Sequence, residues 1–207
     1  MSNDIDLSKQ IVSDYRQAGG YGEKIYDLPH DNNRTKESIA VLAEWLIELE
    51  ERWPGEETEA RATARILLIE ALDCRQARKS AAIPALLSQF ELDKTMSLDT
   101  RWSAGNSLYK IPADDAYFDN MVRVAQNRTL GPARQMVVNW LWKSQRKDEA
   151  SAVALSQLDD ESVQGHALEA LARLRTQGIR DQVEPFLSSK NRWHRRCARS
   201  ILDHLTD

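Results

Sequence analysis

The chain has 207 residues, of which 42% are hydrophobic and 29% are charged, and its formal net charge is -4. This composition excludes a disordered chain and a disulfide-stapled one. No stretch reaches the roughly 18 apolar residues that a membrane span needs, and the start, MSNDIDLSKQ, has no signal-peptide pattern. We therefore expect a folded cytoplasmic protein that does not enter a membrane.

Charge and cysteine content narrow the function classes further. A pI near 5.7 argues against a general nucleic-acid binder, although a local basic patch is compatible with an acidic total. The two cysteines, Cys74 and Cys197, lie far apart in the sequence. Their number and spacing predict reduced, buried thiols and not an extracellular disulfide framework.

The first 35 residues are predicted to form a helical cap and a loop. Apolar residues at helical spacing predict a helix from Ile5 to Ala18, and the GGYG sequence from Gly19 to Gly22 predicts a loop. These residues do not share the pattern of the remaining chain. We expect them to cover one end of a helical stack, because an uncapped stack exposes apolar core.

From residue 36 onward, apolar residues recur at spacings of three and four, which predicts helices throughout and no strands. The predicted helices form about five hairpins. In chain order the pairs are Lys36–Glu51 with Glu56–Arg75, Arg78–Leu92 with Leu98–Ile111, Asp114–Asn127 with Gly131–Ser144, Asp148–Leu158 with Glu161–Arg175, and Ile179–Ser188 with Arg192–Leu205.

The second helices of these pairs share a template: a polar residue, small or aliphatic residues three and four places later, and an aliphatic residue seven places later. The polar position is occupied by Arg61, Arg101, Arg134, Gln164 and His194, with a period of roughly 30 to 40 residues. The four template positions lie on one helical face. A hairpin alone cannot bury that face, so the template predicts hairpins stacked into a solenoid.

The segments TRWSAGNSL, SVQGHALEALARL and RWHRRCARSIL resemble the second helices of HEAT repeats, above all the short repeats named after phycobilisome lyases. The resemblance covers roughly residues 36–205. It implies an all-α fold, a right-handed α-α superhelix of about five hairpins over residues 36–207, with 1–35 as its cap. The chain departs from the family pattern in its long first repeat, and in Gln164 and His194 where arginine is usual.

The resemblance also implies that the second helices line a concave groove. Their segments carry more Lys and Arg than Asp and Glu, while the first-helix segments carry the reverse, so we expect the groove to attract an acidic partner. The stripe beside the packing face is the candidate partner-binding surface, and we call it the groove stripe. Its nominated residues are Trp102, Asn106, Tyr109, Gln135, Asn139, Trp142, Glu169, Arg195 and Arg199.

A purely structural interpretation stands beside this one. Arg61, Arg101 and Arg134 fall on the inward stripe, so we expect them to bond to acidic turn residues or helix ends and not to a partner. The aromatic members of the groove stripe either fill gaps between repeats or form a recognition surface. The basic cluster around Arg192, Arg195, Arg196 and Arg199 is either a solvated end of the array or a docking site for an acidic group.

Catalytic and metal-binding signals are weak. His194 and Cys197 have an H-x-x-C spacing without a second pair, and GGYGEK lacks the ending of a phosphate-binding loop. His166 and Glu169 lie three residues apart, a spacing more typical of a surface contact than of an acid/base pair. We therefore nominate no catalytic residue, no metal site and no cofactor.

Three functions follow from these observations. The first is a non-enzymatic protein-interaction module, an adaptor or an immunity-type binder, whose groove holds an acidic protein. The alternative is DNA binding, by analogy with the HEAT-like alkylpurine DNA glycosylases, although the basic surplus is modest. The third, bilin lyase or isomerase activity, rests on the name of the repeat alone.

Overall fold

The computed structural model describes residues 2–91, 96–111 and 113–205, with only the backbone for residues 2–6. Every regular element in these ranges is helical, as the spacing of apolar residues predicted. The chain divides into two compact units, an N-terminal unit, Met1–Ala113, and a C-terminal unit, Asp114–Asp207. None of the described helices is both long and apolar enough to cross a bilayer.

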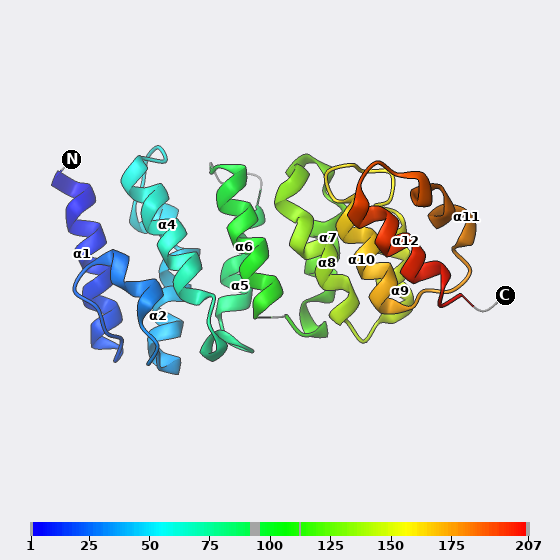
Figure 1. Ribbon diagram of the computed structural model, residues 1–207. Coiled ribbons are helices and arrows are strands. Elements are labelled where there is room, and N and C mark those ends of the chain that lie inside the picture. Colours follow the sequence, from blue (N-terminus) through cyan, green and yellow to red (C-terminus); the bar gives the residue numbers. More distant parts are fainter. Residues whose placement is uncertain (1, 92–95, 112, 206–207) are drawn as a thin grey trace. The chain divides into compact units, whose positions relative to one another are not determined.

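The N-terminal unit begins with α1, which packs against α2, η1 and α4 (Figure 1). Threonine or serine caps α2, α4 and α6 by accepting a backbone N–H bond, which explains why these helices begin where they do. The elements of this unit are α1 (Ser2–Gln17), η1 (Ile25–His30), α2 (Lys36–Ile47), α3 (Leu49–Arg52), α4 (Glu59–Leu72), η2 (Arg75–Ala77), α5 (Ala82–Leu87), η3 (Ser88–Phe90) and α6 (Leu98–Lys110).

The C-terminal unit repeats the alternation of a first and a second helix. Its elements are η4 (Asp115–Tyr117), α7 (Phe118–Gln126), η5 (Arg128–Arg134), α8 (Gln135–Trp140), η6 (Leu141–Lys143), α9 (Lys147–Leu155), α10 (Gln164–Leu174), α11 (Arg180–Val183), η7 (Glu184–Ser188) and α12 (Arg192–Leu202). The described helices are shorter than predicted, because 3-10 turns replace parts of them. For example, Gly131, at φ 48°, and Pro132 lie inside the 3-10 segment η5, where the backbone is kinked before α8 begins.

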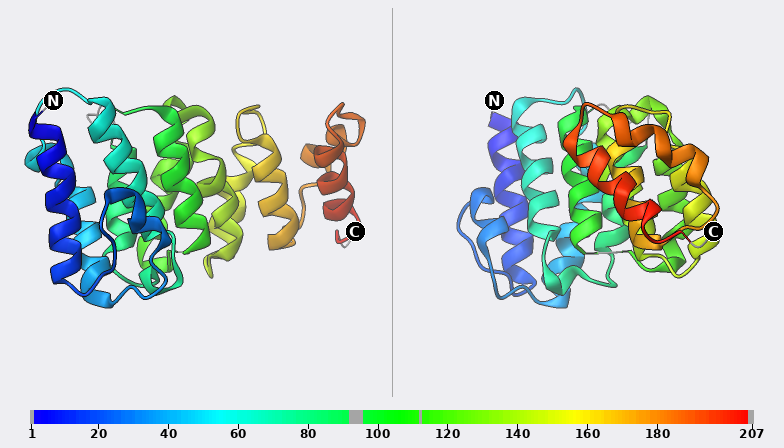
Figure 2. Two further views of the ribbon diagram at one scale, coloured as in Figure 1. Left: turned by 60° about the vertical axis from the view of Figure 1, so that its left-hand side comes forward. Right: turned by 45° about the vertical axis from the view of Figure 1, so that its right-hand side comes forward.

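Within each unit, helices that are close in the chain pack against each other. In the N-terminal unit α2 packs against α4 and α5 against α6, and the second helices α4 and α6 also lie against each other. The left view of Figure 2 shows α4 between α1 and α6. In the C-terminal unit α9 packs against α10, while α10 lies between α8 and α12.

The template positions form the packing faces between these helices. In α6, Arg101, Ala104, Gly105 and Leu108 are all buried, and in α10 Ala167, Leu168 and Leu171 are fully buried. Cys197 of α12 is a buried free thiol in one of the small-residue positions, whereas the free thiol of Cys74 is half-buried. The predicted end of a helix at Leu92 lies outside the described residues.

The loop after α1 is held by buried polar contacts. The Tyr15 hydroxyl donates to Asp31 Oδ2 at 2.6 Å, and the backbone N–H groups of Tyr21 and Asn33 donate to the same carboxylate at 2.9 and 2.8 Å. These bonds hold the pKa of Asp31 below its usual range, although burial opposes them. Residues 19–35 therefore form a fixed part of the N-terminal unit, including a 3-10 helix, η1, that the sequence did not predict.

Candidate functional site

The nominated residues of the N-terminal unit form one stripe on α6, and Trp102 is its exposed member. Trp102 is 43% exposed, and Leu98, one turn before it, is 47% exposed. Asn106 and Tyr109 continue the stripe as half-buried residues. The neighbouring face of α6 carries the buried template residues, so the helix packs along that face and presents two large apolar side chains beside it.

The arginines at the first template position are structural. Arg101 Nε donates to the Gln89 carbonyl at 3.1 Å and Nη2 donates to the Glu91 carbonyl at 2.9 Å, so Arg101 ties α6 to the end of the preceding helix. Arg61 Nη1 donates to the Trp53 carbonyl at 2.7 Å. Arg134 Nη1 donates to the Ala125 carbonyl at 2.6 Å, and its guanidinium pairs with Asp160. The structural interpretation of these arginines is confirmed.

The two remaining pairs use the same kind of contact. Gln164 Nε2 donates to the Leu158 carbonyl at 2.5 Å. In the last pair the contact is made by Arg195, the residue after the template position His194. Arg195 Nη1 donates to the carbonyls of Ser189 and Lys190 at 2.6 and 2.9 Å. We call these five contacts the carbonyl clamps. Arg195, a nominated groove residue, is thus bonded within its own hairpin.

The nominated residues on α8 are less accessible than those on α6. Gln135 is half-buried, and its Nε2 donates to the Ser162 carbonyl at 2.9 Å. Asn139 is only 4% exposed, and its Oδ1 atom has no hydrogen-bond partner. Both side chains therefore lie within the packing of the C-terminal unit, and they offer a partner little direct contact.

Trp142 and Glu169 are joined by an arginine that sequence reasoning did not nominate. The Arg173 guanidinium lies 4.7 Å from the centroid of the half-buried Trp142 ring, and its Nη2 pairs with Glu169 Oε1 at 2.9 Å. Arg173 and Glu169 lie four residues apart on α10, so they share one helical face. The stacked tryptophan, arginine and carboxylate form a preorganised polar and aromatic surface. The i, i+4 spacing of Glu169 and Arg173 was the sequence signal for it.

On α12, Arg199 is exposed, as are Arg192 and Arg196. Trp193, beside them, is a packing residue: its ring meets that of His166 edge to face at 4.9 Å and lies over Gly165 of α10. Trp193 is half-buried in this contact. Burial lowers the pKa of His166, although the nearby Glu169 carboxylate opposes that shift.

Cys197 and His166, which the sequence singled out, both lie against packed neighbours. Burial, followed by the nearby Glu169 carboxylate, raises the pKa of the Cys197 thiol, so Cys197 is a poor nucleophile and a poor metal ligand. In the described part of the chain, no three His, Cys, Asp or Glu side chains are grouped as a metal site requires. His166 packs against a tryptophan and not toward an open site.

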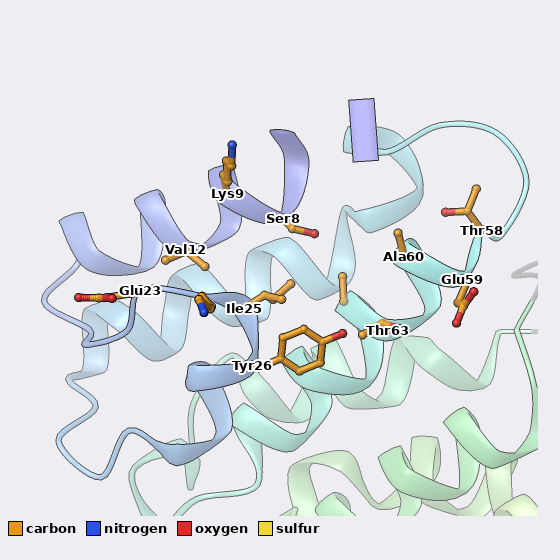
Figure 3. Close-up of a pocket in the computed structure, with 12 residues that line it drawn as sticks. Ser8, Lys9, Val12, Glu23, Ile25, Tyr26, Thr58, Glu59, Ala60 and Thr63 are labelled. Carbon is orange, nitrogen blue, oxygen red and sulfur yellow. The ribbon is translucent and has the colours of Figure 1, made fainter. Parts of the chain in front are cut away.

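A pocket in the N-terminal unit was missed by sequence reasoning. It has a volume of about 640 Å³ and lies between α1, η1 and the first turns of α4 (Figure 3). Val12 of α1, Ile25 and Tyr26 of η1, and Ala60 and Thr63 of α4 line it. Residues 19–35 show no helical periodicity, so nothing in the sequence indicates that this loop folds back onto α4.

The groove stripe therefore has exposed residues on α6 and α12, Trp142 and Glu169 joined through Arg173, and one half-buried and one buried residue on α8. Comparison of the chain with protein-family models, with curated proteins and with solved structures finds no match.

Proposed function

We propose that the protein is a non-enzymatic interaction module of stacked HEAT-like hairpins, forming a right-handed α-α superhelix, that holds an acidic partner protein on its second helices. An adaptor or an immunity-type binder works in this way. The repeated carbonyl clamps and the contacts between successive second helices within each unit support the repeat architecture.

The exposed pair Leu98 and Trp102 is the observation that carries the binding role. Two large apolar side chains lie one turn apart on α6 and remain 47% and 43% exposed. Tryptophan is enriched among the residues that dominate binding energies at interfaces. A folded protein gains nothing in stability from leaving such a pair in water, whereas a partner that covers the pair gains its burial energy.

The exposed arginines of α12 support the proposal that the partner is acidic. The exposed side chains of Arg196 and Arg199 lie on α12, and α12 packs against α10, whose Arg173 stacks on Trp142 of η6. Complementary charge raises the rate of association and sets specificity more than it sets affinity. We therefore expect substitutions on α12 to act mainly on the association rate and its salt dependence.

The test needs a partner obtained first by affinity capture from the native cell extract with the unaltered protein. We expect Leu98→Ala and Trp102→Ala each to weaken the partner's affinity by about tenfold or more. Ile47→Ala is the matched control, because Ile47 is 41% exposed but belongs to α2, in the row of first helices. Equal affinities for Leu98→Ala, Trp102→Ala and the unaltered protein would refute the proposal.

A salt titration distinguishes an acidic protein partner from DNA. Binding of duplex DNA at low salt, falling steeply with added salt and lost in an Arg196→Glu, Arg199→Glu variant, would replace the protein-partner proposal with the DNA-binding alternative. We expect no such binding, because the exposed arginines of α12 occupy a single short helix.

A further inference from the structure

The turn between α4 and α5 carries three exposed cations, Arg75, Arg78 and Lys79. None of the three side chains has an ion pair or a hydrogen bond with any residue that the structure describes. By contrast, the two buried arginines of α4 both pair with Glu57. We call residues 75–79 the basic turn. It is a positive patch that the chain itself does not neutralise.

The charge of the basic turn exceeds what the end of α4 requires. Cations near a helix C-terminus complement the helix dipole, but this effect falls off within the last turn of the helix. The helix α4 ends at Leu72, and Arg78 and Lys79 lie beyond the following 3-10 helix, η2. The dipole of α4 therefore accounts for Arg75 at most.

The backbone at Lys79 indicates that its charge matters. Arg78, at φ -61° and ψ 135°, followed by Lys79, at φ 54°, is the pattern of a type II turn. The Ser80 hydroxyl closes the turn by donating to the Ala77 carbonyl at 2.6 Å. Glycine or asparagine is usual at the position of Lys79, because a Cβ atom is strained at positive φ. A lysine kept at a cost in stability favours a functional role for its side chain.

The spacing of the two arginines suits a pair of carboxylates. The Arg78 N–H donates to the Arg75 carbonyl at 3.3 Å, so the two residues lie one 3-10 turn apart, and side chains at that spacing are on the same side. At 2.0 Å per residue the arginines are about 6 Å apart. Carboxylates at i and i+4 of a helix, or at alternate residues of an extended segment, are about 6–7 Å apart.

A short acidic segment fits the surroundings of the turn better than a nucleic acid does. At the other end of α4, Glu56 and Glu59 are exposed. Figure 1 shows the loop of residues 53–58 at the upper end of α4 and the basic turn at its lower end. A duplex carries one charge per about 1.7 Å along its whole length, so it would meet these glutamates as well as the turn. A peptide with a few carboxylates ends within the turn.

The helix α6 joins the basic turn to the exposed pair Leu98 and Trp102. Lys110, the last residue of α6, pairs with Asp73, which directly precedes the turn region. From Leu98 to Lys110, α6 rises by about 18 Å. A partner that covers Leu98 therefore reaches the basic turn with a segment that lies along α6.

We propose that the basic turn binds an acidic segment of the partner protein, and that this contact fixes the direction in which the partner lies along α6. The inference rests on the proposed function, because the partner that supplies the acidic segment is the one that covers Leu98 and Trp102. It places carboxylates of the partner about 18 Å from the group that covers Leu98.

The first test uses hexaglutamate as the probe and the full-length ¹⁵N-labelled protein at low salt. We expect saturable NMR shifts of the backbone amides of residues 75–80, and none with hexalysine. Lys79→Gly should weaken this binding about two- to fivefold, and Arg78→Gln combined with Lys79→Gly about tenfold. Because glycine relieves the strain at φ 54°, Lys79→Gly should not lower the melting temperature, so that lost binding is not lost folding.

Arg175→Gly is the matched control. Arg175 is an exposed cation at φ 55° in the turn after α10, so this variant removes the same charge and the same strain from the other unit. The hexaglutamate shifts at residues 75–80 should not change. Three results would overturn the proposal: no shifts at these residues, equal binding by Lys79→Gly and the unaltered protein, or duplex DNA bound at the turn without hexaglutamate binding.

The captured partner separates this inference from the proposed function. If Trp102→Ala weakens the partner's affinity and Lys79→Gly does not, the turn is not part of the interface and only this inference fails. If Lys79→Gly weakens the partner's affinity and neither Leu98→Ala nor Trp102→Ala does, the proposed role of the apolar pair fails and the acidic contact remains.

Discussion

Replacing Gly165 by alanine tests how α10 and α12 pack. In an isolated helix, alanine is favoured over glycine by about 1 kcal/mol. Here, however, a Cβ atom at position 165 would lie 2.4 Å from Cζ3 and 2.7 Å from Cε3 of Trp193, and 3.0 Å from Nε2 of His194. Ordinary carbon contacts are about 3.5–4.0 Å, so the indole ring would have to move by about 1 Å.

The ring has little room for this movement, because it also meets His166 edge to face at 4.9 Å. Overpacking of this kind costs about 2–3 kcal/mol. After the gain in helix propensity is subtracted, we expect Gly165→Ala to lower the free energy of unfolding by about 1–2 kcal/mol. The structure thus predicts the opposite sign from helix propensity alone.

Urea denaturation followed by circular dichroism measures this change, and a double-mutant cycle identifies its cause. In a Trp193→Ala background the clash is absent, so Gly165→Ala should be neutral or stabilising by up to about 1 kcal/mol. A Gly165→Ala protein as stable as the unaltered one, or an equal loss in both backgrounds, would refute the proposed packing of Trp193 on Gly165.

Three further predictions concern polar contacts. Arg134→Met should lower the free energy of unfolding by about 3 kcal/mol, because it removes a fully buried guanidinium and leaves the Ala125 carbonyl and Asp160 without it. Arg128→Met, which breaks an exposed ion pair, should change the urea midpoint little, and equal effects of the two would contradict this account. Tyr15→Phe should lower the free energy of unfolding by about 1–2 kcal/mol, because it removes the buried hydrogen bond to Asp31. Tyr21→Phe should leave the thermal unfolding temperature unchanged, because the Tyr21 ring is 77% exposed. Because folding holds the pKa of His166 below its ordinary 6.5, the unfolded chain binds the proton first as the pH falls. The free energy of unfolding should therefore be full above pH 6.5 and fall below it. His166→Gln should reduce this dependence of stability on pH, and an unchanged dependence would exclude His166 as its source.

The helical fold and the packing faces could be predicted from the sequence, because they depend on spacing. The template placed small residues at Ala104 and Gly105, and both are buried between helices. The same spacing could not show where first helices shorten into 3-10 turns. That depends on single backbone positions, such as Lys79 with φ 54°, which is uncommon for a side chain of this kind.

The candidate surfaces were only partly predictable. Helical geometry placed Trp102 outside the packing face of α6, and the side chain is exposed. The same rule placed Asn139 beside the packing face of α8, where it is buried, because exposure also depends on which elements pack against the helix. Arg65 was missed altogether: it is fully buried and donates to Glu57 and Gln89, and no spacing in the sequence distinguishes it from a surface arginine.

The pocket could not be predicted, because it arises from a loop that lacks periodicity. Its position depends on the bonds from Tyr15 and Tyr21 to Asp31, which hold the loop against α1 and bring η1 onto α4. Contacts of this kind join residues ten or more apart in the chain, and helix spacing carries no information about them.

The carbonyl clamps have a consequence for the order in which the chain folds. Each clamp joins residues that are close in sequence: Arg61 with Trp53, Arg134 with Ala125, and Gln164 with Leu158 are examples. A contact over so few residues closes a short loop, at a small cost in chain entropy, before distant parts of the protein have met. The clamps therefore favour early contact between the two helices of each hairpin, and we expect these local contacts to precede the stacking that buries the packing faces.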